Sequence, residues 1–181
     1  MVQASRTIKV NEDPREARLD RSLVWHGLVM KAENPLPFVP VITSCKVIER
    51  RTGGLIREIV DKGDTIREVV TFDPERMVKF ERTSGRVLGT ILNEIIEDPG
   101  GDLALKFTFT LTIDNVAAGS AEEKEFAAQM VDGYLIGARD AQSHAQARQR
   151  ESAVGGIVSM AQRSPSACPS MTTSVLTEFA M

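Results

Sequence analysis

The sequence has few of the residues from which metal sites and disulfide frameworks are built. Its 181 residues include two cysteines, Cys45 and Cys168, and two histidines, His26 and His144. These are too few and too far apart for a disulfide framework, a thiolate metal site or a histidine cage. No stretch matches a phosphate-binding glycine loop or a Ser-His-Asp array. We therefore expect no metal and no cofactor.

The sequence also lacks a long apolar run and an excess of positive charge. No window approaches the roughly 18 apolar residues of a membrane helix, and the first residues do not resemble a signal peptide. The net charge is −3 and the pI about 5.5, so no basic field attracts nucleic acid. With 42% hydrophobic and 26% charged residues, the composition is that of a globular protein. We expect a cytoplasmic protein that neither binds nucleic acid nor inserts into a membrane.

What the sequence does contain is a long succession of strand signals. A short strand is predicted over 5–10 and a helix over 18–33, which ends at Asn34-Pro35 because proline disfavours the α conformation before it. From Thr43 to Asp114, turn signals at regular intervals divide six strands. The loops between them are short, so we expect neighbouring strands to be antiparallel.

A second helix is predicted after the strands. Ser120 and Glu123 have the spacing of a capping box, with Ser at the N-cap and Glu three residues later. The helix has an apolar stripe that includes Tyr134, and it ends near residue 151. We predict one domain over 1–151 and a flexible or loosely docked tail over 152–181, which is rich in Ser, Pro, Ala and Thr.

The segment GLIREIVDKGDTIREVV, residues 54–70, has an Arg-Glu dipeptide on each arm of a hairpin. If Lys62-Gly63 is a two-residue loop, Arg57 lies opposite Glu68 on one face, and Glu58 lies opposite Arg67 on the other. A slip of one residue would break both pairs, so the charges favour this register.

The register can be continued along the chain. We predict a three-residue loop at Asp73–Glu75, a two-residue loop at Ser84–Gly85 and a five-residue loop at Asp98–Asp102. These loops give one mostly apolar inner face that contains Arg57, Glu68, Val78, Phe80, Gly89, Ile91, Asn93, Ile95, Leu105, Phe107, Phe109 and Leu111.

Arg57 and Glu68 are the polar exceptions on this face, together with Asn93. Burying an ion pair costs several kcal/mol per ion and often gains little over a hydrophobic substitute. Two interpretations follow. The pair is a structural cross-strand contact that fixes the register, or it serves a cavity that needs a cation and a carboxylate. Glu58–Arg67 is expected to be solvated and worth well under about 1 kcal/mol.

The element order resembles the α+β helix-grip fold of the START and polyketide-cyclase-like (SRPBCC) superfamily. The sequence is most similar to the AtaL-like family, through VWHGLVMKAENPLPFVPVITSCKVIER (24–50), GLIREIV (54–60), IREVVTF (66–72) and LKFTFTL (105–111). This resemblance implies a seven-stranded curved sheet around a long C-terminal helix, with an internal hydrophobic cavity. It also implies that Arg57, Glu68 and Asn93 match polar positions of the family.

The resemblance predicts a cofactor-independent enzyme of secondary metabolism that binds a small hydrophobic molecule. Proton transfer would drive cyclisation, dehydration or isomerisation, with Glu68 as general acid or base and Arg57 as the anchor for an oxyanion. The alternatives are a carrier without catalysis and an accessory protein whose interior is only core; a homodimer is left open. The candidate ligand-binding residues are Trp25, Phe80, Asn93, Phe107, Phe109 and Tyr134. For Trp25, packing is the competing role; His26 is expected at the surface.

Overall fold

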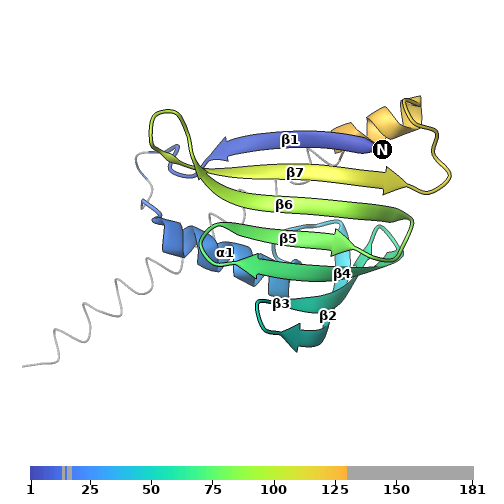
Figure 1. The fold of residues 1–181 in the computed structure, drawn as a ribbon, viewed down its shortest axis with the longest axis horizontal. Helices are drawn as coiled ribbons and strands as arrows, with labels where there is room; N and C mark the ends of the chain where they lie inside the picture. The colour runs from blue at the N-terminus through green and yellow to red at the C-terminus, as the bar shows by residue number, and fades with distance from the viewer. Residues whose placement is uncertain (14, 16–17, 130–181) are drawn as a thin grey trace, which may run out of the picture.

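The structure is a computed structural model that describes residues 1–13, 15 and 18–129. One antiparallel sheet of seven strands, in the order β1-β7-β6-β5-β4-β3-β2, makes up most of it (Figure 1). The elements are β1 (Val2–Lys9), α1 (Arg21–Glu33), β2 (Ile42–Arg51), β3 (Gly54–Asp61), β4 (Asp64–Asp73), β5 (Met77–Arg82), β6 (Val87–Glu97) and β7 (Leu103–Ile113). This is the predicted meander, with β1 added at its far edge beside β7.

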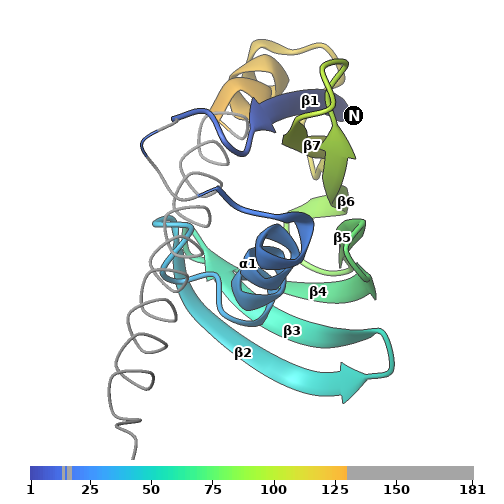
Figure 2. The ribbon, with the colours of Figure 1, turned by 90° about the vertical axis from the view of Figure 1, so that its left-hand side faces the viewer.

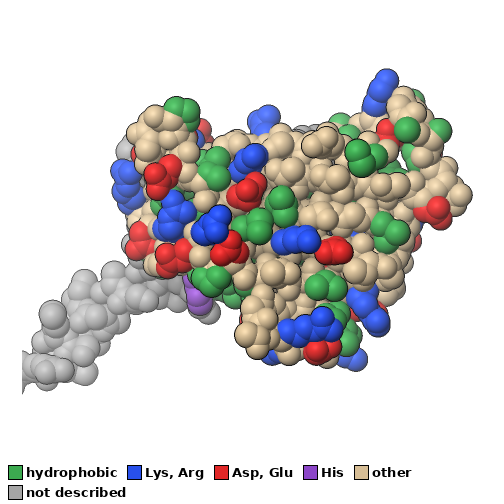
Figure 3. Space-filling model, in the orientation of Figure 1, with side chains coloured by type: hydrophobic (Ala, Val, Ile, Leu, Met, Phe, Trp, Pro, Cys, Tyr) green, Lys and Arg blue, Asp and Glu red, His purple; other side chains and the backbone are tan. Residues whose placement is uncertain are grey.

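The sheet is strongly curved, and α1 lies on its concave side (Figure 2). The core occupies the space between them: most inward side chains of β3 to β7 form one buried apolar cluster with Val24, Leu28 and Ala32 of α1. Ile59 and Ile66 belong to a second, smaller cluster near the start of β2. The convex side carries exposed cross-strand pairs such as Glu58–Arg67, and Figure 3 shows acidic and basic side chains interspersed on that face. No helix in the described part of the chain is long and apolar enough to span a membrane.

Helix α1 is defined by its ends. The Asp20 side chain accepts a hydrogen bond from the Leu23 amide at 2.9 Å, so Asp20 is the N-cap and the helix begins at Arg21, later than predicted. At the other end, Asn34 has an extended conformation before Pro35.

The second helix begins where the capping box predicts. Residues 121–129 are helical, and the Glu123 amide donates to Ser120 Oγ at 3.1 Å. Phe126 and Ala127 pack against the core. The remainder of the predicted helix, including Tyr134, and the tail over 152–181 lie outside the described residues.

The strand registers confirm most of the predicted inner face. Arg57 pairs with Glu68 and Glu58 with Arg67 between β3 and β4. The five-residue loop between β6 and β7 is also as predicted, with Glu97 opposite Leu103.

Two predicted loops were wrong. Strand β4 stays paired through Asp73, which lies opposite Met77, so the loop is Pro74–Arg76, with Glu75 at a φ of +58°. The connection between β5 and β6 spans 83–86, not two residues. Each difference moves the strand register by two residues, an even number, so every side chain keeps its predicted face. The residue of β5 that lies opposite Glu68 is, however, Arg82 rather than Phe80.

Candidate functional site

Four charged side chains form a continuous chain of ion pairs across β3, β4 and β5. Arg57 binds one oxygen of Glu68 through Nε at 2.8 Å and Nη2 at 2.6 Å. Arg82 Nε lies 3.3 Å from the other oxygen of Glu68, and Arg82 Nη2 lies 3.2 Å from Asp61 Oδ2. The relative exposure of Glu68 is 1%, and that of each arginine is 4%. The predicted Arg57–Glu68 pair is therefore part of a larger buried network.

Strand pairing explains how these groups meet. Glu68 lies on the middle one of three strands, directly opposite Arg57 on β3 and Arg82 on β5. Directly paired residues point to the same face of a sheet, so both guanidinium groups reach one carboxylate. Asp61 ends β3, beside the turn into β4, and meets the far end of Arg82.

Arg57 also fixes the end of helix α1. Its Nη1 donates to the carbonyl oxygens of Lys31 at 3.2 Å and Ala32 at 2.5 Å, which lie in the last turn of the helix. Its guanidinium carbon lies 4.8 Å from the centroid of the Phe80 ring, within the range of a cation–π contact. These contacts give Arg57 a positioning role between helix and sheet.

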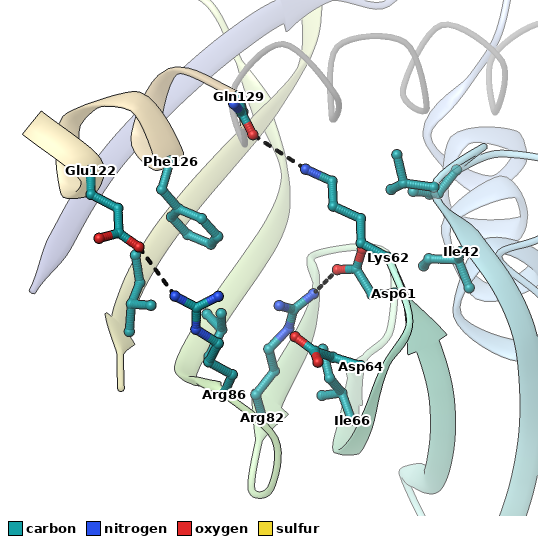
Figure 4. Close-up of a pocket in the computed structure, with 14 residues that line it drawn as sticks. Ile42, Asp61, Lys62, Asp64, Ile66, Arg82, Arg86, Glu122, Phe126 and Gln129 are labelled. Atoms are coloured by element: carbon teal, nitrogen blue, oxygen red, sulfur yellow. Dashed lines mark hydrogen bonds and ion pairs between the residues drawn. The ribbon is translucent and has the colours of Figure 1, made fainter. Parts of the chain in front are cut away.

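A pocket of about 270 Å³ lies at the end of this charge network (Figure 4). Arg82 and Asp61 line it, whereas Arg57 and Glu68 are not among its described lining residues. The pocket is formed by the segment before β2, the β3–β4 turn, the start of β6, the end of β7 and the second helix. Its apolar lining is Val39, Val41, Ile42, Ile66, Val87, Ile113 and Phe126.

Two polar contacts link the second helix to the sheet across this pocket. Arg86 and Glu122 form an ion pair at 3.1 Å, and Lys62 Nζ lies 3.3 Å from Gln129 Oε1 (Figure 4). Both are exposed, whereas Arg82 is buried. The pocket thus combines an apolar wall with one desolvated cation and its carboxylate partner, where charge interactions are strongest.

Asp61 supplies an unsatisfied acceptor at this pocket. Its Oδ2 receives the Arg82 contact, but its buried Oδ1 has no hydrogen-bond partner in the part of the chain that the structure describes. Buried polar atoms are nearly always paired, with protein or with ordered water. A donor group on a bound molecule would complete this site.

A buried lysine was missed in the sequence. Lys31 lies on the buried face of α1, seven residues after Val24 and three after Leu28, and its Nζ is 5.3 Å from the centroid of the Phe107 ring. Burial, reinforced by the charge of Arg57 and opposed by that of Glu68, lowers the pKa of Lys31 to about 7. A lysine in the last turn of a helix normally complements the helix dipole at the surface, so the residue type alone does not indicate burial. Its helical spacing was the available signal.

Asn93 is completely buried on β6, opposite Val78 and Phe107. Neither its amide nitrogen nor its carbonyl oxygen has a hydrogen-bond partner within the described ranges. Its inward position is as predicted; contact with a ligand stays a prediction.

The predicted aromatic residues occupy the interior rather than the described pocket. Phe80, Phe107 and Phe109 are buried core residues. Trp25 is partly buried and packs edge-on against Phe72, with ring centroids 6.1 Å apart. Their role as ligand contacts stays a prediction, as does the catalytic role of Glu68 and Arg57. His26 is exposed. No cluster of His, Cys, Asp and Glu suited to a metal occurs among residues 1–13, 15 and 18–129.

The curved seven-stranded sheet, with α1 on its concave side, places the chain in the helix-grip class of folds, to which aromatase/cyclase structures also belong. Within this class, the chain belongs to the AtaL family, described as acetylaranotin biosynthesis cluster protein L, which matches residues 4–152. No curated protein matches the sequence.

Solved structures share the fold at low sequence identity. The di-domain ARO/CYC StfQ from the steffimycin biosynthetic pathway is 15% identical with a TM-score of 0.60, over 82% of this chain and 52% of StfQ. The chain therefore spans about half of that protein. The Zhui aromatase/cyclase from a Streptomyces species is 17% identical with a TM-score of 0.58, over 81% of this chain and 94% of Zhui. Ara h 8.0201 is 12% identical with a TM-score of 0.52, over 80% and 98% of the two chains.

Proposed function

We propose that this protein is a cofactor-independent enzyme of secondary metabolism that acts on a hydrophobic, polyketide-like intermediate. The reaction is a proton transfer that leads to cyclisation, dehydration or isomerisation. Membership of a family described by a biosynthesis cluster and the fold shared with aromatase/cyclases support this class of substrate.

The observation that carries the proposal is the buried charge network that ends at an apolar pocket. Desolvating Arg57, Glu68 and Arg82 costs several kcal/mol per ion, and a well-packed apolar substitute is often as stable. Register alone does not require it, because the exposed Glu58–Arg67 pair and the DKGD turn specify the same hairpin. Stabilising a ligand whose charge changes during the reaction would explain why these buried charges are present.

Each group has a chemical role in this proposal. Asp61 removes a proton from carbon next to a carbonyl group, and its carboxylate becomes a carboxylic acid. The electron pair moves to the carbonyl oxygen, and Arg82 stabilises the resulting enolate. Glu68 and Arg57 hold Arg82 at the pocket, and Glu68 also serves as an acid or base for a ligand that reaches past Arg82. The enolate then attacks a second carbonyl through carbon, expels a hydroxyl group from the β carbon as water, or is protonated at a new carbon. In each case Asp61 returns its proton, to the new alkoxide, to the departing hydroxyl group or to that carbon.

Native mass spectrometry of the protein purified from its own producing cells tests this proposal. The wild type is compared with Asp61→Asn and Glu68→Gln, and unfolding curves establish that each variant is folded. We expect at least one variant to retain a small hydrophobic molecule of a different mass from any that the wild type carries, because substrate remains unconverted. The same molecule on all three proteins would identify a carrier. No ligand on any of them would contradict both functions.

A further inference from the structure

Lys31 is a buried amine that the proposed reaction does not use. It projects from the inward face of α1, close to the Phe107 ring on β7, and its relative exposure is 4%. The lysines of the described sheet, such as Lys46 on β2, are by contrast exposed or partly exposed. Lysine is rarely this deeply buried in proteins, which sets Lys31 apart from the lysines of the sheet.

The surroundings of Lys31 favour a neutral amine. Lys31 lies on the same buried face of α1 as Leu28, and the Arg57 guanidinium, which binds the Lys31 carbonyl, places a second positive charge nearby. Burial first and Arg57 second lower the pKa of Lys31 to about 7, against the attraction of Glu68. At neutral pH about half of the molecules then carry Lys31 as a neutral amine, whereas an exposed lysine is protonated in all but roughly one molecule in a thousand or fewer. A neutral, desolvated lysine is a nucleophile toward carbonyl carbon.

Asn93 is an independent sign that a polar ligand belongs near Lys31. It lies directly opposite Phe107 in the sheet, and Phe107 is the ring that Lys31 contacts. Both of its polar side-chain atoms are buried and without a hydrogen-bond partner among the residues described. Nearly all buried polar atoms in native proteins have a partner, in the protein or in ordered water. A carbonyl or hydroxyl oxygen of a ligand next to the amine would accept from the Asn93 amide.

We propose that Lys31 forms a Schiff base with a ketone group of the ligand, and that 1,3-dicarbonyl compounds are the chemical class it takes. The choice of 1,3-dicarbonyls rests on the proposed function, because polyketide-like intermediates contain this unit; the nucleophilic amine itself does not depend on it.

The step balances without a further reactant. Neutral Lys31 Nζ attacks the carbonyl carbon, a C–N bond forms, and the carbonyl oxygen takes up a proton from the nitrogen. The carbinolamine then loses one water molecule to give the C=N bond. With a 1,3-dicarbonyl compound, the product shifts a proton to become a conjugated enaminone, which is stable enough to detect. In turnover, water reverses the step and releases the ligand.

Acetylacetone, the smallest stable 1,3-diketone, is the probe. The folded full-length protein is incubated with it across pH 6 to 10, and adducts are located by peptide mass mapping and by the ultraviolet absorption of the enaminone. We expect one adduct, with the mass of acetylacetone minus one water, to form first at Lys31. Its rate should level off above about pH 7, whereas the rate at Lys46 should still rise at pH 9 to 10.

Two variants make the result decisive. Lys31→Met, verified as folded by its unfolding curve, should lose the fast adduct, while Lys46→Gln should retain it. The inference is overturned if Lys31 is unmodified while exposed lysines react, or if Lys31 and Lys46 share one pH profile. A reactive Lys31 in a protein that carries no ligand from its producing cells would remove the proposed function but leave this inference standing. If a variant retains a ligand from its producing cells but Lys31 does not react with acetylacetone, the proposed function stands and this inference falls.

Discussion

Replacing Glu68 by leucine should lower the free energy of unfolding by about 3–5 kcal/mol. Glu68 is the shared counter-ion of two buried guanidinium groups, with both of its oxygens in contact with them. Its removal leaves Arg57 and Arg82 inside the protein with like charges and without that carboxylate. Leucine is of similar size, so the cost reports lost charge compensation rather than a cavity. Urea unfolding at pH 7, followed by circular dichroism, measures it.

Glu58→Leu is the matched control in the same hairpin. Glu58 also faces an arginine across β3 and β4, but the two groups are 3.7 Å apart and both are solvated. Surface pairs of this kind are worth roughly 0–1 kcal/mol, so this substitution should change the free energy of unfolding by less than about 1 kcal/mol. Equal losses at the two positions would mean that water reaches the Glu68 network.

Replacing Lys31 by methionine should stabilise the protein at pH 6 and progressively less at higher pH. The pKa of Lys31 is near 10.5 in the unfolded chain and about 7 in the folded protein. Between these values the unfolded state binds one more proton, so the wild type gains stability as the pH rises, by about 1.4 kcal/mol per unit. Below pH 7 the full cost of burying the protonated amine applies, on the order of 4–5 kcal/mol, and above about pH 10.5 this cost disappears.

Urea unfolding of the wild type and Lys31→Met at half-unit steps from pH 6 to pH 9.5 tests this behaviour. The difference in free energy of unfolding should be largest at pH 6 and should shrink steadily above pH 7. Lys46→Met, at an exposed position, should give a difference that does not change over this range. A pH-independent difference for Lys31→Met would show that the amine remains charged inside the protein.

Much of the fold was predictable because its signals are local. The DKGD turn and the two Arg-Glu dipeptides set the register of β3 and β4, and the five-residue loop at Asp98–Asp102 set that of β6 and β7. The alternation of a strand then determined which side chains face inward. This is why Arg57, Glu68 and Asn93 were expected in the interior and are found there.

The parts of the site that were missed depend on less local geometry. Glu75 adopts a positive φ, which is uncommon for glutamate and is therefore not predicted from the sequence. The resulting loop brings Arg82 opposite Glu68. Asp61 stands beside a turn, where a carboxylate is normally solvated, and joins the buried charge network only because Arg82 reaches it. Lys31 is buried because α1 packs into the curved sheet, and a single helix does not reveal that packing.

The central claim is that the pocket beside Asp61 and Arg82 binds a hydrophobic molecule with an oxyanion. The most direct test is a fluorescence titration with anilinonaphthalene sulfonate, an apolar anion, on the wild type, Arg82→Met and Arg86→Met. Both arginines line the pocket, but only Arg82 is buried. With all three proteins verified as folded, we expect Arg82→Met to weaken binding at least about tenfold and Arg86→Met to change it by less than about threefold, since a desolvated charge interacts more strongly. Equal affinity in all three proteins would contradict the claim.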